Sequence, residues 1–166
     1  TVEESDTNYV CGYDVESGDQ LWAFQDRHDL SIMQTQDGAV YVDCEDGVLL
    51  CLNVGTGVLR WQHQFRKLVF DDHKQRARKT TAGVDFFEIT HEGIVTCNHW
   101  GTVYLLDPET GYEEWELFPE DSDGGPEGTC RVVEDTIIRI KGTKIESFDL
   151  CSGEEQWSFE MDATEP

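Results

Sequence analysis

The stretch DPETGYEEW at residues 107–115 contains a phrase that occurs four times in this chain of 166 residues. The phrase consists of Asp or Asn, two variable residues, Ser or Thr, Gly, three variable residues and Trp. The other copies are DVESGDQLW at residues 14–22, NVGTGVLRW at residues 53–61 and DLCSGEEQW at residues 149–157. Four copies that agree at every fixed position indicate that the chain is built from an internal repeat.

Each fixed position of the phrase suits a turn between two antiparallel strands. The Asp or Asn side chain accepts hydrogen bonds from backbone amides ahead of it, and Ser or Thr can do the same more weakly. The glycine can take a positive φ and close the turn, and this is expected at Gly18, Gly57, Gly111 and Gly153. The Trp begins the next strand, and its large surface favours packing between neighbouring sheets. We therefore expect four buried docking residues, Trp22, Trp61, Trp115 and Trp157.

Short apolar runs bounded by Gly, Asp and Asn come before the turns and predict β-strands, as in VLLCL at residues 48–52. Successive Trp residues of the repeat lie 39, 54 and 42 positions apart, which is the length of one β-propeller blade. The sequence thus predicts an all-β fold, a β-propeller of four-stranded antiparallel blades forming one domain over residues 1–166. The expected parts are a half blade at 9–26, blades at 27–65, 83–118 and 128–161, and an insertion at 66–82.

The repeated phrase resembles that of the quinoprotein (PQQ-like) propeller family, in which a tryptophan-docking motif joins adjacent blades. The resemblance extends over nearly the whole chain. It implies four-stranded blades set radially about an axis. It does not imply a cofactor, because the same repeat builds non-enzymatic propellers such as the outer-membrane assembly lipoprotein family. We place this chain in that non-enzymatic branch as an expectation.

The number of strands leaves a ring incomplete. Residues 1–8 are too polar to supply the first two strands of the half blade, so the expected total is fourteen strands, or about three and a half blades. Open sheet edges favour aggregation, and three arrangements would cover them: a longer protein, a compact ring of about four blades, or closure by a second chain. We favour the last, a homodimer in which the half blade packs against the strand around residues 157–161 of a second copy.

Catalytic and metal-binding chemistry has little support in the sequence. The resemblance implies that quinoprotein enzymes hold their quinone with a disulfide between adjacent Cys residues, and no two Cys are adjacent here. Cys97 and His99, with His91 nearby, could ligate zinc, but zinc needs three or four such ligands. No GxSxG motif marks a nucleophile. We predict no catalytic residue, no cofactor and no metal site, and a quinone- or metal-dependent oxidoreductase subunit is the alternative.

The charge of the chain is strongly negative, with 35 acidic and 12 basic residues and a net charge of −23. Such a surface repels nucleic acid and anionic membranes. The excess of acid and the scarcity of Lys resemble proteins of salt-loving archaea, so we expect a halophilic protein. No apolar run is long enough for a membrane span.

The six cysteines form no CxxC pair, and most lie in strand-like apolar runs. Cysteine in such runs serves as a small hydrophobic residue, so we expect reduced, buried thiols and a cytoplasmic location. No signal peptide is visible. Because the chain begins with Thr1, an extracellular location after processing is the alternative.

The insertion departs from the composition of the rest of the chain. It carries six of the twelve basic residues, Arg66, Lys67, Lys74, Arg76, Arg78 and Lys79. Long loops in compact domains are often functional, and Arg suits bidentate contact with carboxylate or phosphate. We predict that this loop binds an acidic protein partner, which can be a second copy of the chain. The alternatives are a solvated loop that lies against the protein's own acidic surface, and a nucleic-acid adaptor. The function expected overall is a non-enzymatic scaffold or protein-binding module.

Overall fold

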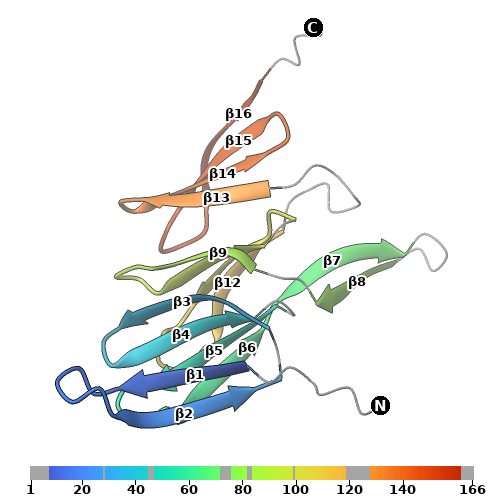
Figure 1. The fold of residues 1–166 in the computed structure, drawn as a ribbon. Helices are drawn as coiled ribbons and strands as arrows, with labels where there is room; N and C mark the ends of the chain where they lie inside the picture. The colour runs from blue at the N-terminus through green and yellow to red at the C-terminus, as the bar shows by residue number, and fades with distance from the viewer. Residues whose placement is uncertain are drawn as a thin grey trace, which may run out of the picture. The chain divides into compact units, whose positions relative to one another are not determined.

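The computed structural model describes residues 8–27, 29–44, 47–71, 76–81, 84–98, 100–118 and 128–161 (Figure 1). The chain divides into two compact units, Thr1–Phe65 and Arg66–Pro166, a division that the expected single domain did not include. All regular structure in the described ranges is β, so the predicted all-β class is confirmed. None of the described segments forms a helix that could cross a membrane.

Sixteen strands are described, and they pair into five antiparallel sheets. The first unit contains β1 (Asn8–Tyr13), β2 (Gln20–Asp26), β3 (Leu30–Gln36), β4 (Ala39–Cys44), β5 (Val48–Asn53) and β6 (Leu59–Gln64). The second unit contains β7 (Arg66–Asp71), β8 (Arg76–Thr81), β9 (Val84–Ile89), β10 (Ile94–Asn98), β11 (Val103–Leu106), β12 (Glu113–Leu117), β13 (Gly128–Val133), β14 (Thr136–Lys141), β15 (Lys144–Asp149) and β16 (Glu155–Glu160).

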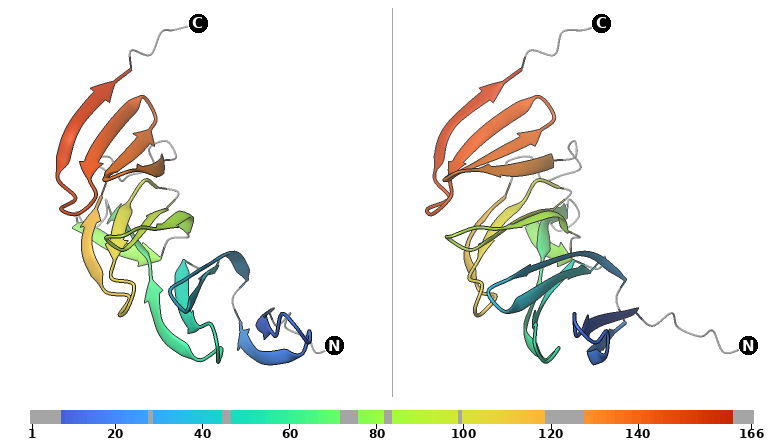
Figure 2. Two further views of the ribbon diagram at one scale, coloured as in Figure 1. Left: turned by 90° about the vertical axis from the view of Figure 1, so that its left-hand side faces the viewer. Right: turned by 60° about the vertical axis from the view of Figure 1, so that its left-hand side comes forward.

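Three of the sheets are four-stranded meanders, in which each strand pairs with the next one along the chain. Their orders are β3-β4-β5-β6, β9-β10-β11-β12 and β13-β14-β15-β16, and the two views of Figure 2 show the meander clearly in the last of them. The hairpin β1-β2 stands where the half blade was predicted. The predicted four-stranded antiparallel blades are therefore confirmed.

The insertion differs from its prediction as a loop. Its described residues form a two-stranded hairpin in which β7 pairs with β8 from Arg66↔Thr81 to Asp71↔Arg76. The hairpin raises the strand count from the expected fourteen to sixteen. The run Leu68-Val69-Phe70 is rich in residues that favour strands, and it explains why this segment pairs despite its basic charge.

The repeated phrase forms the same turn in all four copies. In the second copy, the Asn53 side-chain oxygen accepts hydrogen bonds from the backbone amides of Gly55 and Thr56, both at 3.0 Å. The Gly57 amide then donates to the Asn53 carbonyl at 2.8 Å. The four turn glycines have φ between 68° and 75°, so the predicted positive φ is confirmed. In each copy the ladder shifts register just before the Asp or Asn.

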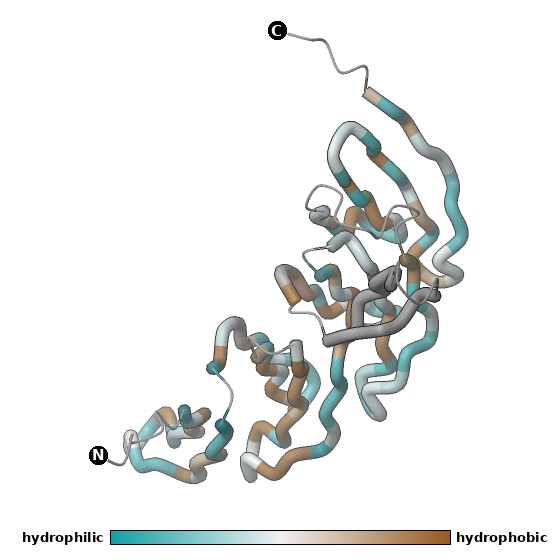
Figure 3. Tube along the Cα trace, turned by 90° about the vertical axis from the view of Figure 1, so that its right-hand side faces the viewer, coloured by the Kyte–Doolittle hydropathy of each residue, from teal (hydrophilic) through white to brown (hydrophobic). Residues whose placement is uncertain are grey.

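Each unit has its own hydrophobic core between sheets. The middle strands β4, β5, β10 and β11 are buried along almost their whole length, and hydrophobic stretches recur within the sheets of Figure 3. In the first unit the hairpin β1-β2 packs on the sheet β3–β6 through Val10, Val40, Val42, Cys44, Val48, Leu50 and Leu52. In the second unit the sheets β9–β12 and β13–β16 pack through Val95, Cys97, Val103, Leu105, Cys130, Ile137, Phe148 and Leu150.

Candidate protein-interaction surface

Trp22 joins the hairpin β1-β2 to the neighbouring sheet in the first unit. Its indole Nε1 donates a hydrogen bond of 2.9 Å to the backbone carbonyl of Val54, in the turn between β5 and β6. A Cβ added to Gly57 in that turn would overlap the indole ring. The absence of a side chain at Gly57 therefore makes room for the ring, and the carbonyl satisfies its polar atom.

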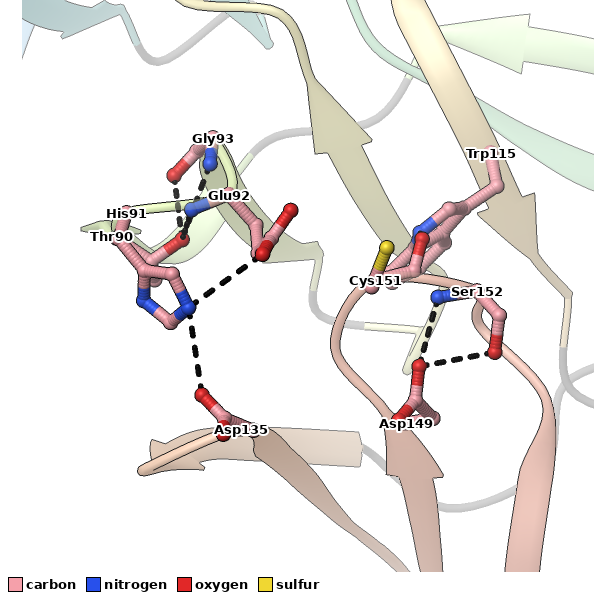
Figure 4. Close-up of polar contacts among 9 residues, drawn as sticks. All are labelled: Thr90, His91, Glu92, Gly93, Trp115, Asp135, Asp149, Cys151 and Ser152. Atoms are coloured by element: carbon pink, nitrogen blue, oxygen red, sulfur yellow. Dashed lines mark hydrogen bonds and ion pairs between the residues drawn. The ribbon is translucent and has the colours of Figure 1, made fainter.

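Trp115 makes the corresponding contact in the second unit (Figure 4). Its Nε1 donates to the carbonyl of Cys151 at 3.1 Å, in the turn between β15 and β16. The ring lies against Gly153, where an added Cβ would be 3.0 Å from Cδ2. The Asp149 side chain stabilises this turn by accepting from the Ser152 amide at 2.8 Å. The hydrogen bonds from the Ser152 amide and the Ser152 hydroxyl, the latter at 2.9 Å, lower the pKa of Asp149.

The other two Trp residues of the repeat differ from each other. Trp61 is 8% exposed and its ring lies 5.9 Å from that of Tyr41, in agreement with the expected burial. The expected burial of Trp157 is wrong within this chain, because the residue is 49% exposed. No turn among the described residues covers it. Burial of a repeat Trp depends on a neighbouring sheet, which the phrase itself does not supply.

The sheet face that bears Trp157 is apolar and exposed. Phe159 on the same strand is 59% exposed. It lies opposite Ile145, which in turn lies opposite the exposed Ile140 of β14. Met161, just after β16, is also exposed. Contiguous exposed apolar side chains on a soluble protein are typical of interaction surfaces.

A second exposed apolar face lies on the hairpin β1-β2. Tyr13 is 61% exposed and Leu21 is 59% exposed, and Tyr9 and Val15 are exposed as well. Side chains alternate between the two faces of a strand, so Tyr9 faces away from the core residue Val10. A cavity of about 230 Å³ also adjoins β1, and its lining includes Tyr9, Cys11 and Met33.

The predicted partner-binding residues of the insertion are placed only in part. The backbones of Arg66 and Lys67 lie in β7, and those of Arg76, Arg78 and Lys79 lie in β8. Lys74 lies outside the described residues, and so do the side chains of the other five. Partner binding by these six residues stays a prediction.

Of the candidate metal ligands, Cys97 and His91 lie in different surroundings. Cys97 is buried in the core of the second unit, while His91 is exposed and its Nε2 lies 3.3 Å from the Asp135 carboxylate (Figure 4). His99 lies outside the described residues. The thiol of Cys130 hydrogen-bonds with that of Cys97, and this bond and burial raise the pKa of Cys130. A protonated thiol is a poor metal ligand, and the described residues contain no cluster of three His, Cys, Asp or Glu that could hold a metal.

The cysteines as a group agree with the prediction except at two positions. None of the six, all within the described ranges, forms a disulfide. Cys44, Cys51, Cys97 and Cys130 are buried, Cys11 is half-buried, and Cys151 is exposed. Cys151 lies in the turn that receives Trp115, where its carbonyl accepts the indole hydrogen bond.

Sequence reasoning missed two features that connect the sheets. Gly12 lies directly opposite Trp22 in the ladder, and a Cβ there would overlap the indole ring. In the second unit, the buried Arg139 pairs with Glu146 at 2.7 Å and donates to the Gly101 carbonyl at 3.1 Å. The sequence does show the opposite charges of Arg139 and Glu146 in two successive apolar strands. Buried charges are normally paired, so this ion pair could have been predicted.

Four-stranded antiparallel sheets joined in sequence by tryptophan contacts define a β-propeller repeat protein. Comparison with known families agrees: a PQQ-type family model, described as outer membrane protein assembly factor BamB, matches residues 1–68. No curated protein matches the chain.

Solved structures of low sequence identity share the fold. BamB from Moraxella catarrhalis is 17% identical with a TM-score of 0.62, and the match covers 95% of this chain and 47% of BamB. The quinohemoprotein alcohol dehydrogenase from Comamonas testosteroni is 17% identical with a TM-score of 0.57, covering 89% of this chain and 31% of that enzyme. The WD40 domain of Neurospora crassa Pan2 is 11% identical with a TM-score of 0.56, covering 81% and 39%. The chain thus spans less than half of each of these proteins.

Proposed function

We propose that this protein is a non-enzymatic β-propeller scaffold that binds other proteins through its exposed apolar sheet faces. The observation that carries the proposal is the distribution of exposed large apolar residues. Of the fourteen such residues whose side chains the structure describes, nine lie on or beside the hairpin β1-β2 and the sheet β13–β16. Exposed apolar surface that gathers on particular sheets is characteristic of protein-binding sites.

The sequence favours binding over catalysis. The fold alone does not decide, because propellers of this type include both BamB and alcohol dehydrogenases, and function must be argued from sites. No two cysteines are adjacent in this chain, whereas the quinone-binding members that it resembles use such a pair.

A protein partner is favoured over nucleic acid by the net charge of −23. A polyanion would be repelled by most of the surface, and the basic hairpin β7-β8 would have to overcome that repulsion. The four buried thiols suit a reducing compartment, and we propose a cytoplasmic location on that basis.

Two measurements test this function. Purified protein mixed with pyrroloquinoline quinone and Ca²⁺ should show no stoichiometric change in quinone absorbance, and a saturable change would overturn the non-enzymatic assignment. For the binding face, we suggest cross-linking in cells of the source organism, followed by mass spectrometry. The double variant W157S/F159S should lose partners that the wild type retains. The variant Y112S, altered at another exposed aromatic residue, should keep them, and equal recovery by all three proteins would contradict the assignment of the face.

A further inference from the structure

Within the described ranges, one Trp of the repeat has no turn against its ring, and one turn of the repeat has no Trp against its glycine. Among the described residues, no turn covers the Trp157 ring, which is half exposed. The first turn has the opposite vacancy: a Cβ added to Gly18 would meet no heavy atom within 4 Å. At the two filled contacts, by contrast, the turn glycine lies directly against an indole ring. The Gly18 turn therefore offers the kind of contact that the Trp157 ring lacks.

The exposed sheet faces beside Trp157 and beside the Gly18 turn correspond to faces that pack together elsewhere in the repeat. In the second unit, the face of sheet β9–β12 that bears Trp115 is covered by the next sheet along the chain. In the sheet β13–β16, the corresponding face bears Trp157 and Phe159 and is exposed. The reverse face carries Ile137 and Phe148 and is already packed in the core.

The hairpin β1-β2 presents the receiving face. Its inner face bears Val10 and Trp22, which pack on the sheet β3–β6. Its outer face bears the exposed Tyr9, Tyr13 and Leu21. In the first unit, the sheet β3–β6 receives Trp22 on one face and carries its own Trp61, opposite Cys51, on the other. The outer face of β1-β2 therefore corresponds to the face of β3–β6 that packs against Trp22. The Gly18 turn lies beside this outer face.

We propose that the protein associates with a second copy of itself, and that Trp157 of one copy docks on the Gly18 turn of the other. This inference rests on the proposed protein-binding function and names its partner. The indole Nε1 of Trp157 donates to a backbone carbonyl of the turn, as Trp22 does to Val54 and Trp115 does to Cys151.

The charges beside the contact make this association dependent on salt. The receiving turn contains Asp14, Glu16 and Asp19, and the strand that bears Trp157 is flanked by acidic residues. These like charges repel in dilute buffer and are screened at about 1 M salt, where the Debye length is about 3 Å. We expect dimers in concentrated KCl and dissociation on dilution of the salt.

The test uses one variant of each half of the contact. W157A removes the incoming ring from an exposed site. G18N blocks the turn with a side chain that still tolerates the positive φ of 75° found there. Each variant alone should be monomeric by light scattering and sedimentation in about 2 M KCl. An equimolar mixture should form heterodimers, because Trp157 of G18N can dock on the intact Gly18 turn of W157A.

Three results would overturn the self-docking. The first is a wild-type protein that remains monomeric in concentrated KCl at about 100 μM, a concentration that saturates any micromolar contact. The second is dimerisation of either variant alone, and the third is a mixture that fails to associate although wild type does. In dilute buffer, where wild type is also monomeric, the circular dichroism and thermal midpoints of both variants should match those of wild type. In concentrated KCl, Y112A should dimerise normally. A wild type that captures other proteins through Trp157 without self-association would refute only this inference and leave the proposed function intact.

Discussion

The indole of Trp22 donates its hydrogen bond to the carbonyl of Val54, a residue 32 positions away in the sequence. The contact fixes the hairpin β1-β2 to the sheet β3–β6 by one polar and one apolar interaction. Trp115 makes a similar contact in the second unit with the carbonyl of Cys151, one position later in its turn. The same side chain thus satisfies its polar atom and fills the space above a glycine, which makes the contact specific for Trp.

Replacing Trp115 by Ala should destabilise the second unit strongly. The ring packs on the core that the sheets β9–β12 and β13–β16 share, and removal of a large core aromatic costs about 3 kcal/mol when it is partly exposed. Urea denaturation followed by circular dichroism in low salt measures the loss. Trp157→Ala is the matched control, because its exposed ring should change the free energy of unfolding by less than about 0.5 kcal/mol. Equal losses for the two variants would contradict the docking role of Trp115.

Gly12→Ala should destabilise the first unit although the change adds one methyl group. The new Cβ would overlap the Trp22 ring, and overpacking of this kind costs about 1–3 kcal/mol. Gly55→Ala is the control, since its Cβ would meet only the Asn53 side-chain oxygen at 3.5 Å. Thermal unfolding of the two variants side by side tests the difference, and an unchanged midpoint for Gly12→Ala would show that Trp22 does not occupy this position.

The turn carboxylates should contribute to the loss of stability in acid. Hydrogen bonds from the Ser152 amide and hydroxyl lower the pKa of Asp149 below its ordinary value of 3.8. Because the folded-state pKa is the lower one, this stabilisation is present above pH 3.8 and is lost as the pH falls through the folded-state pKa. Asp149→Asn keeps the accepting oxygen, as Asn53 does naturally, and does not titrate.

Urea midpoints between pH 7 and pH 3 test this expectation. The midpoint of Asp149→Asn should fall less than that of wild type. Glu114→Gln, which removes an exposed carboxylate on β12, should follow the wild-type curve. A parallel fall in all three proteins would exclude a special role for the Asp149 turn.

Salt should stabilise the folded protein. The 35 acidic residues outnumber the 12 basic ones, and their mutual repulsion weakens the compact state when it is unscreened. The thermal midpoint should therefore rise from dilute buffer to about 2 M KCl, where screening is nearly complete. Measurement on W157A separates this effect from dimer formation, and a flat or falling midpoint would remove the basis for regarding the protein as halophilic.

The turns and blades were predictable because their signals are local. The Asp or Asn, the Ser or Thr and the Gly of each phrase form hydrogen bonds within five residues, so the sequence shows the whole unit. The role of Gly12 was not visible, since it follows from its pairing with Trp22 across the ladder. The corresponding positions in the other repeats hold Cys51, Leu105 and Ser147, so this position has no constant residue.

The exposed Trp157 and the hairpin at the insertion show two further limits. Burial of Trp157 requires a second surface, which its phrase does not encode. In the insertion, the long interval between Trp61 and Trp115 suggested a loop, but the strand preference of Leu68, Val69 and Phe70 was the stronger local signal. Neither error changes the turns or the strand order of the repeat.

The glycine turn and the Trp that fills it come from different copies of one phrase, and this has an evolutionary consequence. A tandem duplication of one blade's coding segment would bring its own turn for the preceding Trp and its own Trp for the following turn. The new junctions would reproduce the old ones without any compensating mutation. An array of this kind can therefore lengthen or shorten by whole blades while every internal joint stays intact.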